Sequence, residues 1–200
     1  MPTFTCGSCS SSFELGQAVL DRYPGWTPRQ CRACRDVTSA RPTGAGGGRS
    51  PVTPSVDPDG GVFTDGSADP NPGVGGWGAV WVEDGTVVEE RCGGEPDTTN
   101  NRMELRALIE AARMVPEGTP LVLWSDSNLA VRTVNEWASG WERRGWTRKT
   151  GPVQNLDLVK ELYELLRRRP ELEVRWIKAH AGHRWNEYAD ALATKGRSVT

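Results

Sequence analysis

Four acidic residues stand at positions where the hydrophobic pattern of this 200-residue chain favours core residues: Asp65, Glu104, Asp126 and Asp190. Glu104 is the clearest case. It continues the apolar stripe of Leu108, Ala111 and Val115 in a segment, 101–115, whose spacing predicts an amphipathic helix. By strand alternation, Asp65 shares a face with Phe63, and Asp126 shares one with Trp124. Asp190 falls among Ala189, Ala191 and Leu192.

Acids in such positions point to metal chemistry. Burying one unpaired carboxylate costs on the order of several kcal/mol, and neighbouring carboxylates repel, so some would have to stay protonated. A hard divalent cation resolves this conflict, because carboxylate oxygens suit magnesium. Each acid alone has an ordinary explanation: a turn residue, a residue that complements a helix dipole, or a helix cap. Only the combination, with the flanking sequences, favours a metal site.

A second set of candidate ligands lies near the N-terminus: Cys6, Cys9, Cys31 and Cys34. Two Cys-x2-Cys pairs separated by 21 residues predict a zinc site. A segment this short cannot build a sufficient apolar core, so the zinc would be structural and would supply folding energy. The alternative is a redox-active pair, which would need a surrounding βαβ pattern that this segment lacks. We expect Cys92 to be an unpaired thiol of the core or of a hairpin.

Composition divides the chain into three parts. Residues 36–60 hold 15 Gly, Pro, Ser or Thr among 25 positions, which predicts a flexible linker between a module at 1–35 and a domain at 61–200. A net charge of −2 excludes a globally basic nucleic-acid binder, but not a local basic patch. Because the chain has no run of 18 apolar residues and no signal peptide, we expect a cytoplasmic protein that does not span a membrane.

Alternating and helical patterns predict the elements that carry the acids. Single strands are expected over 60–67, 120–127 and 171–180. A hairpin that turns at Asp84-Gly85 is expected over 75–95. Helices are expected over 101–115, 156–169 and 185–197. A further short helix, after the strand 120–127, is expected to end near Val134. Strands come first as a meander and then alternate with helices. This order predicts a mixed sheet with helices on its faces.

Five stretches then carry a family resemblance: TDGSADPNPGVGGWGAV (64–80), TTNNRMELRAL (98–108), SDSNLAV (125–131), WASGWERRGW (137–146) and IKAHAGHRWNEYADALA (177–193). They resemble the type 1 ribonuclease H family, and the fourth looks like its basic handle. The resemblance covers nearly all of residues 61–200. It implies an α/β fold with a five-stranded mixed sheet flanked by helices, and hydrolysis of the RNA strand of RNA–DNA hybrids.

The resemblance also implies roles for the chemical residues. Asp65, Glu104, Asp126 and Asp190 match the family's ligands for two magnesium or manganese ions. His180, ten residues before Asp190, matches the catalytic-loop histidine; the alternative is a loop histidine that only caps or hydrogen-bonds. We expect His183 to be structural. Water would attack the phosphodiester in line, with the ions about 4 Å apart, leaving 3′-hydroxyl and 5′-phosphate ends.

Two substrate-binding surfaces follow from the same resemblance. Five polar residues would lie along the minor groove: Ser67, Asn71, Asn100, Asn101 and Asn128. Thr99 would contact a phosphate of the DNA strand. Handle residues would bind phosphates and sugars: Trp137, Trp141, Arg143, Arg144 and Trp146, with Arg148 and Lys149 nearby. The handle is less basic than in well-known bacterial members, and Asn128 stands where glutamine is common. The asparagines could instead serve turns and caps, and the basic residues a solvated face. We expect Trp77, Trp124 and Trp176 in the core.

The N-terminal stretch 4–35 is similar to a small bacterial zinc-ribbon family through Phe13, Pro28 and the two cysteine pairs. It would grip a hybrid or duplex and tether the catalytic domain, or else contact a protein. We expect a monomer. Two other functions stay open: a non-catalytic protein that binds RNA–DNA hybrids, and a different nuclease on the same fold, such as an integrase or resolvase.

Overall fold

The computed structural model describes residues 2–5, 12–14, 17, 58–179 and 181–199. The chain divides into two units, residues 1–53 and 54–200. In the first unit, strands β1 (Thr3–Thr5) and β2 (Ser12–Glu14) pair antiparallel. The four N-terminal cysteines and residues 36–57 of the expected linker lie outside the described residues, and so does the expected zinc site.

The second unit is built on a five-stranded sheet in the order β5-β4-β3-β6-β9. Its strands are β3 (Gly61–Ala68), β4 (Gly73–Glu83), β5 (Thr86–Thr98), β6 (Leu121–Ser125) and β9 (Leu172–Trp176). The first three form an antiparallel meander, whereas β6 pairs parallel with β3 and β9 pairs parallel with β6. The expected mixed sheet is confirmed. Asp84 and Gly85 both have positive φ, as a tight hairpin turn requires.

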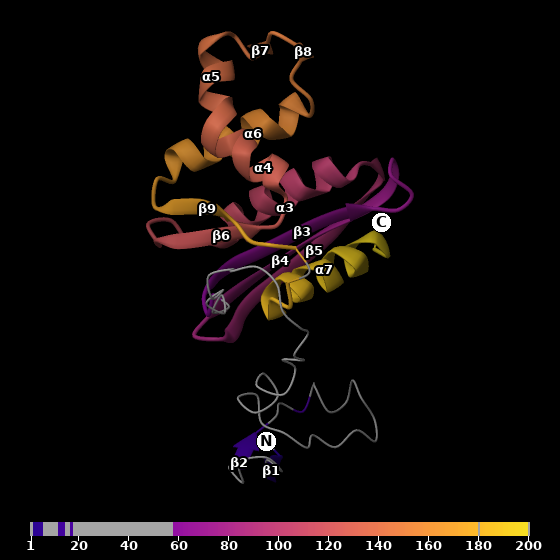
Figure 1. Ribbon diagram of the computed structural model, residues 1–200, viewed down its shortest axis with the longest axis vertical. Helices are drawn as coiled ribbons and strands as arrows, with labels where there is room; N and C mark the ends of the chain where they lie inside the picture. The colour runs from indigo at the N-terminus through magenta and orange to yellow at the C-terminus, as the bar shows by residue number, and fades with distance from the viewer. Residues whose placement is uncertain (1, 6–11, 15–16, 18–57, 180, 200) are drawn as a thin grey trace, which may run out of the picture. The chain divides into compact units, whose positions relative to one another are not determined.

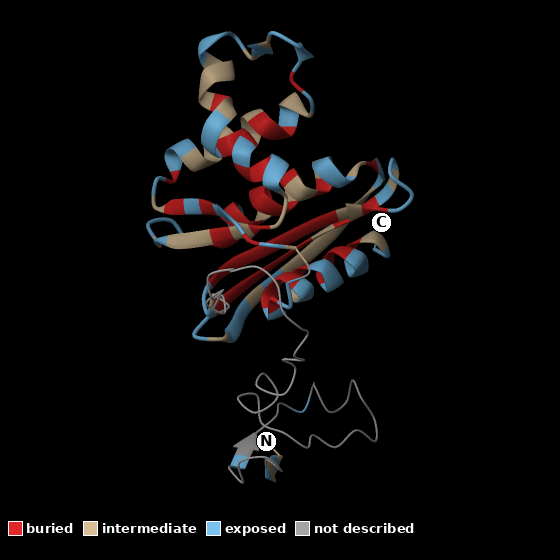
Figure 2. Cartoon of the chain, viewed as in Figure 1, coloured by how far each residue is buried: buried red, intermediate tan, exposed pale blue. Residues whose placement is uncertain are grey.

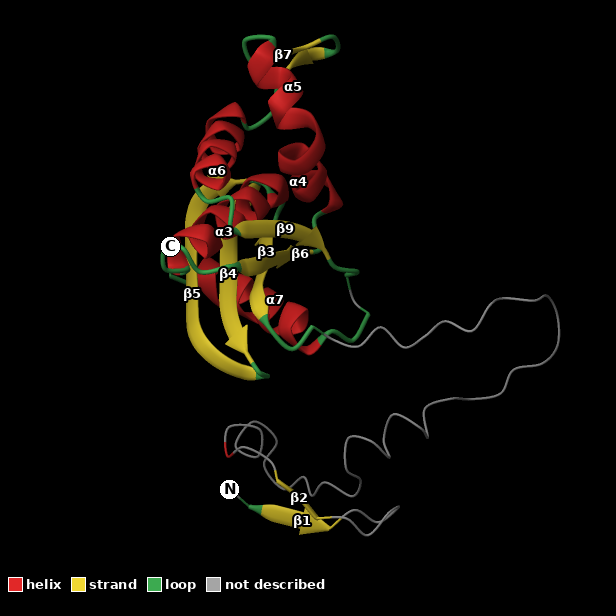
Figure 3. Cartoon of the chain, turned by 90° about the vertical axis from the view of Figure 1, so that its left-hand side faces the viewer, coloured by secondary structure: helices red, strands yellow, loops and turns green. Residues whose placement is uncertain are grey.

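Helices cover both faces of this sheet (Figures 1 and 3). The elements are α3 (Asn100–Met114), α4 (Asn128–Arg132), the π-helical turn η1 (Thr133–Trp137), α5 (Ala138–Arg143), α6 (Leu156–Arg168) and α7 (Arg184–Arg197). α3 lies on one face with α4 and α6 on its side, and α7 lies on the other. α5 and the short strands β7 (Thr147–Arg148) and β8 (Gly151–Pro152) extend away from the sheet.

Two apolar clusters fill the space between these layers. Val62 and Leu123 point toward α3, while Phe63 points toward α7 and packs with Leu192. Strand alternation explains why the neighbours Val62 and Phe63 serve opposite clusters. Figure 2 shows the buried residues running along the sheet and along the helix sides that face it. The acids must therefore lie where this apolar packing ends.

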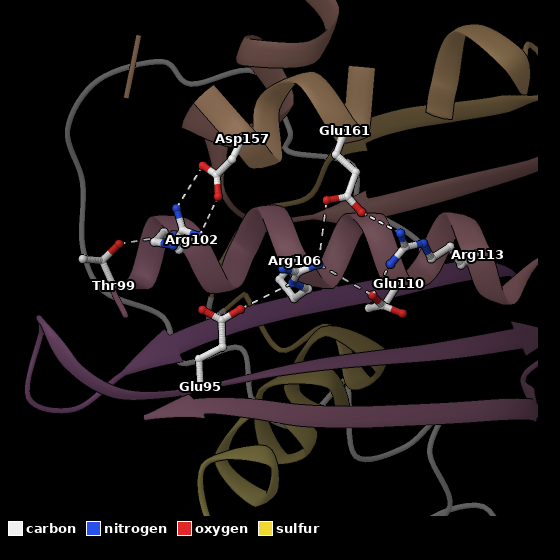
Figure 4. Close-up of polar contacts among 8 residues, drawn as sticks. All are labelled: Glu95, Thr99, Arg102, Arg106, Glu110, Arg113, Asp157 and Glu161. Carbon is white, nitrogen blue, oxygen red and sulfur yellow. Dashed lines mark hydrogen bonds and ion pairs between the residues drawn. The ribbon is translucent and has the colours of Figure 1, made fainter. Parts of the chain in front are cut away.

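Charged residues on the outer side of α3 tie the helix to its neighbours (Figure 4). Arg102 makes a two-pronged contact with Asp157 of α6, with N–O distances of 3.1 and 2.8 Å. Further along, Arg113 reaches Glu161 of α6 at 2.6 Å. Between them, Arg106 lies 3.5 Å from Glu95 of β5. These pairs fix α3 against β5 and α6, and α3 carries Glu104.

Two expectations about this unit are wrong. The helix expected to end near Val134 continues through η1 and α5 to Arg143, because no glycine or proline interrupts residues 128–139. Trp176, expected in the core, is 47% exposed, since it ends β9 at the edge of the sheet. Trp77 and Trp124 are half-buried. No helix among the described residues is long and apolar enough to cross a membrane.

Candidate active site

Two neighbouring parallel strands bring Asp65 and Asp126 together. In the pairing of β3 with β6, Phe63 lies opposite Trp124 and Thr64 lies opposite Ser125. The next residue in each segment is an aspartate: Asp65 within β3 and Asp126 directly after β6. The Thr64 hydroxyl strengthens this register by donating to the Trp124 carbonyl at 2.9 Å. Both aspartates therefore project from the same end of the sheet centre.

Helix α3 supplies the third carboxylate. The helix begins after Thr99, whose hydroxyl accepts a hydrogen bond from the Arg102 amide at 3.4 Å, so Thr99 is its N-cap. Met103 and Leu105 are buried on either side of Glu104. Glu104 is directed from the first turns of α3 toward the end of the sheet, at the edge of the apolar stripe, as its spacing predicts.

Asp65, Glu104 and Asp126 form one cluster, in which a carboxylate oxygen from each lies within 4.8 Å of the others. Burial raises the pKa of Asp65 to about 7, and the charges of Asp126 and Asp190 act in the same direction. Burial, together with the charges of Asp65 and Asp126, raises the pKa of Glu104 well above its ordinary range. Without a counter-charge, these groups resist full ionisation near neutral pH.

This cluster fits a divalent cation. All its donor atoms are carboxylate oxygens, which hard cations such as Mg²⁺ prefer. One oxygen of Glu104, Oε2, is buried and makes no hydrogen bond to any described residue, although a buried carboxylate oxygen normally has a partner. A bound cation would satisfy that oxygen and would favour the ionised form of all three acids.

Asp190, the fourth expected metal ligand, is more exposed than the other three acids. It lies on α7, is exposed, and stands outside the cluster of three carboxylates. Its chain neighbour Ala189 is buried, but one residue along a helix turns the side chain by about 100°. Its apolar neighbours in the sequence therefore predicted more burial for Asp190 than the structure shows. Its charge still acts on Asp65, so it faces the same region of the domain.

The sequence did not predict two residues near the cluster as site residues. Asn186, on α7, donates from Nδ2 to Oδ2 of Asp126 at 2.9 Å. The indole of Trp176 donates to the Asp126 backbone carbonyl at 3.1 Å. A signal for Asn186 existed: it precedes Ala189 and Ala193 by three and seven residues, so it is a polar residue on a buried helical stripe, as Glu104 is.

The two histidines of the last loop differ in what can be said of them. His180 lies outside the described residues, so its catalytic role stays a prediction. His183 is buried immediately before α7, in agreement with a structural residue. Cys92 is a free thiol in β5 that packs beside the α7-side cluster, as expected.

Several of the expected minor-groove residues take part in local structure. The Asn100 side chain accepts from the Ala68 amide at 2.6 Å, and the Asn71 side chain accepts from the Asn100 amide at 3.2 Å. These bonds join the β3–β4 connection to the start of α3. Asn101 and Asn128 are exposed at the first turns of α3 and α4. The Ser67 hydroxyl is buried and makes no hydrogen bond to a described residue.

The expected handle, 137–146, runs from the end of η1 through α5, and its further basic residues Arg148 and Lys149 follow at β7. Trp137 and Trp141 lie beside each other, with ring centroids 6.0 Å apart. Trp146 packs edge-on against Tyr163 of α6 at 5.8 Å, and it and Trp141 border the α3-side core. The basic side chains of this segment remain outside the core: Arg143, Arg144 and Lys149 are exposed, and Arg148 is partly so.

Known proteins similar to this chain agree with the fold. Residues 58–198 match the family model described as RNase H. Ribonuclease HI of Caulobacter vibrioides is 46% identical over 146 residues, covering 72% of this chain and 94% of that protein. Ribonuclease H of Methylorubrum extorquens is 48% identical over 136 residues, covering 68% of this chain but 59% of that protein.

Among solved structures, LC9-RNase H1, a type 1 RNase H with the type 2 active-site motif, is 33% identical with a TM-score of 0.57. The match covers 73% of this chain and 76% of that one. The chain therefore belongs to the RNase H family over residues 58–198.

Proposed function

We propose that this protein is a ribonuclease H, an endoribonuclease that hydrolyses the RNA strand of RNA–DNA hybrids and leaves 3′-hydroxyl and 5′-phosphate ends. The observation that carries this conclusion is the cluster of Asp65, Glu104 and Asp126 at the end of the sheet in a domain of the RNase H family. Relatives that are 44–48% identical are named Ribonuclease H or Ribonuclease HI.

The acids hold the cations. Asp65, Glu104, Asp126 and Asp190 are the ligands, the first three at the centre of the site and Asp190 on α7. When bound by these residues, two magnesium or manganese ions would activate a water and stabilise the oxygen that leaves the phosphodiester. The carboxylates bind and orient, and they need not transfer protons. His180 moves a proton at the reacting oxygens or assists product release, because its titration range suits that role.

The substrate is recognised on both sides of this cluster. Telling RNA from DNA requires reading the 2′-hydroxyl, and amide side chains can both donate to it and accept from it. Ser67 and four asparagines are suited to that role: Asn71, Asn100, Asn101 and Asn128. Thr99 contacts a DNA-strand phosphate near the start of α3. The handle binds the backbone further away through Arg143 and Arg144 and through Trp137, Trp141 and Trp146.

The N-terminal module holds a structural zinc ion through Cys6, Cys9, Cys31 and Cys34 and aids binding of nucleic acid or a protein partner. Strands β1 and β2 support this proposal, because Cys6 and Cys9 lie between them in the sequence. Loss of about one zinc per chain in the Cys31→Ser variant, measured by atomic emission, tests the site. Hybrid affinity of the same variant tests its role. We further propose that the protein acts in the cytoplasm as a monomer, where its thiols stay reduced.

The decisive experiment measures cleavage of one end-labelled strand in each of three duplexes: the RNA strand of RNA–DNA and RNA–RNA, and one DNA strand of DNA–DNA. We expect magnesium-dependent cutting of the RNA–DNA hybrid only, and no cutting by the Asp65→Asn variant. Binding of the hybrid without cutting, with either magnesium or manganese, would replace the enzyme by a binding protein. Cutting of duplex DNA would indicate a different nuclease on the same fold.

A further inference from the structure

We propose that Asn186 is a positioning residue that holds the Asp126 carboxylate in the orientation needed for cation binding. The proposal rests on the proposed function, because it assigns a role within the same site. It concerns a side chain that touches Asp126 from α7, on the sheet face opposite the helix that carries Glu104.

The contact itself fixes the Asp126 carboxylate. Nδ2 of Asn186 donates to Oδ2 of Asp126 at 2.9 Å. An ionised carboxylate only accepts hydrogen bonds, so the amide must present its nitrogen to it. A hydrogen bond to a charged acceptor is about twice as strong as a neutral one. It therefore restrains rotation of the carboxylate and sets the direction in which its remaining lone pairs point.

The surroundings of Asn186 argue against an incidental surface bond. The residue is 4% exposed, and its Oδ1 is buried without a hydrogen bond to any described residue. An unsatisfied buried acceptor is unfavourable for folding. A residue with a small apolar side chain would complete the stripe of Ala189 and Ala193 without this cost. An amide that stays buried at a cost to folding is expected where it serves a site.

A second bond holds the same aspartate at its backbone. The Trp176 indole donates to the Asp126 carbonyl at 3.1 Å from the end of β9. Trp176 therefore locates the main chain, while Asn186 locates the carboxylate. Of the two, only Asn186 acts on the atoms that would contact a cation. Partners of metal ligands typically change metal affinity by about 10- to 100-fold when removed.

The test uses the full chain with Asn186→Leu, which has no donor, and Asn186→Ala, which is smaller and avoids overpacking. Magnesium affinity is measured by calorimetry without nucleic acid, and kcat and KM are measured on an RNA–DNA hybrid. Asn135→Ala is the matched control, because Asn135 donates an equal 2.9 Å hydrogen bond, to the Val174 carbonyl in β9. Circular dichroism and a cooperative thermal transition confirm folding.

We expect both Asn186 variants to bind magnesium about 10- to 100-fold more weakly, with a lower kcat at unchanged KM, while Asn135→Ala binds as the wild type does. Wild-type magnesium affinity in a folded Asn186 variant would overturn the proposal. Loss of cooperative folding in both variants would also overturn it, because Asn186 would then be structural. A wild-type protein that neither binds magnesium nor cuts hybrid would instead refute the proposed function.

Discussion

Gly66 lies directly against the backbone of Glu104: a Cβ built on Gly66 would come 2.2 Å from the Glu104 amide nitrogen. This close approach lets β3 lie against the first turns of α3. Asp65 precedes Gly66, so the same approach brings Asp65 within reach of Glu104. The absence of a side chain at one position thus determines the spacing of two carboxylates.

Substitution of Gly66 should therefore damage both the fold and the site. The Gly66→Ala methyl group would meet backbone atoms, which cannot rotate away, so we expect a loss of about 1–3 kcal/mol in unfolding free energy and weaker magnesium binding. Urea unfolding and calorimetry measure the two effects. Gly60→Ala is the control, because its Cβ would come no closer than 3.4 Å to Val82. Equal stability of the two variants would contradict this account.

The stability of the protein without added magnesium should fall as pH rises from about 4 to 7. Asp65 ordinarily titrates at 3.8, but in the folded chain its pKa is about 7. Between these values the folded state holds a proton that the unfolded state has released, so raising the pH favours unfolding. The raised pKa of Glu104 acts in the same direction. Thermal scans across this range, without magnesium, measure the slope.

Asp65→Asn should remove much of that slope. The variant cannot ionise at this position, so at pH 7.5 without magnesium we expect a higher Tm than that of the wild type, together with lost cleavage. Magnesium should raise the wild-type Tm more at pH 8 than at pH 6, because protons compete with the cation for the carboxylates. A lower Tm for Asp65→Asn at pH 7.5 would show that the charge is not destabilising.

The main lines of the fold and site could be predicted because they follow local periodicity. Alternation marked β3 and β6, the Asp84-Gly85 turn marked the β4–β5 hairpin, and the helical stripe placed Glu104 at the rim of the core. Each of these signals lies within about a dozen residues. The mixed five-stranded sheet followed from the family resemblance, and the observed strand order confirms it.

What could not be predicted depends on contacts between distant segments. Asn186 and Asp126 are 60 residues apart, and their hydrogen bond requires the start of α7 to lie beside the residue that follows β6. The pattern of its strand predicts a core position for Trp176, but β9 is an edge strand, so Trp176, its last residue, is exposed. Asp190 follows the buried Ala189 in the chain yet is itself exposed. Tertiary packing decided each case.

Arg169 provides a stability test far from the acids. Its guanidinium is buried and donates to the carbonyls of Ala112, Val115 and Pro116, where α3 ends, at 2.8–3.0 Å. The Pro116 carbonyl also accepts from the Thr119 amide at 3.3 Å, but the carbonyls of Ala112 and Val115 have no partner within the helix. Arg169→Met would leave them unsatisfied, so we expect a loss of about 2–4 kcal/mol in urea unfolding. The exposed neighbour supplies the control: Arg168→Met should change stability by no more than about 0.5 kcal/mol.

The handle should contribute to binding rather than to chemistry. Arg143 and Arg144 are exposed, and α5, which ends at Arg143, extends away from the sheet. We expect Arg143→Ala and Arg144→Ala each to raise KM for hybrid at unchanged kcat, and to reduce the slope of log affinity against log salt by about 0.7–0.9 per lost phosphate contact. Arg91→Ala, in β5, should leave both quantities unchanged. A fall in kcat at constant KM would place these arginines in the chemical step.

The two outer strands of the sheet, β5 and β9, each present unpaired backbone groups along one side. An uncovered strand of this kind can recruit the same strand of another copy and so begin aggregation. Exposed Glu173 and Arg175 alternate along β9, and the Asn135 amide occupies the Val174 carbonyl there. Along β5, Glu90 is exposed and Pro96 offers no amide hydrogen to a neighbour. The margins of the sheet thus protect the chain against self-association while its centre carries the acids.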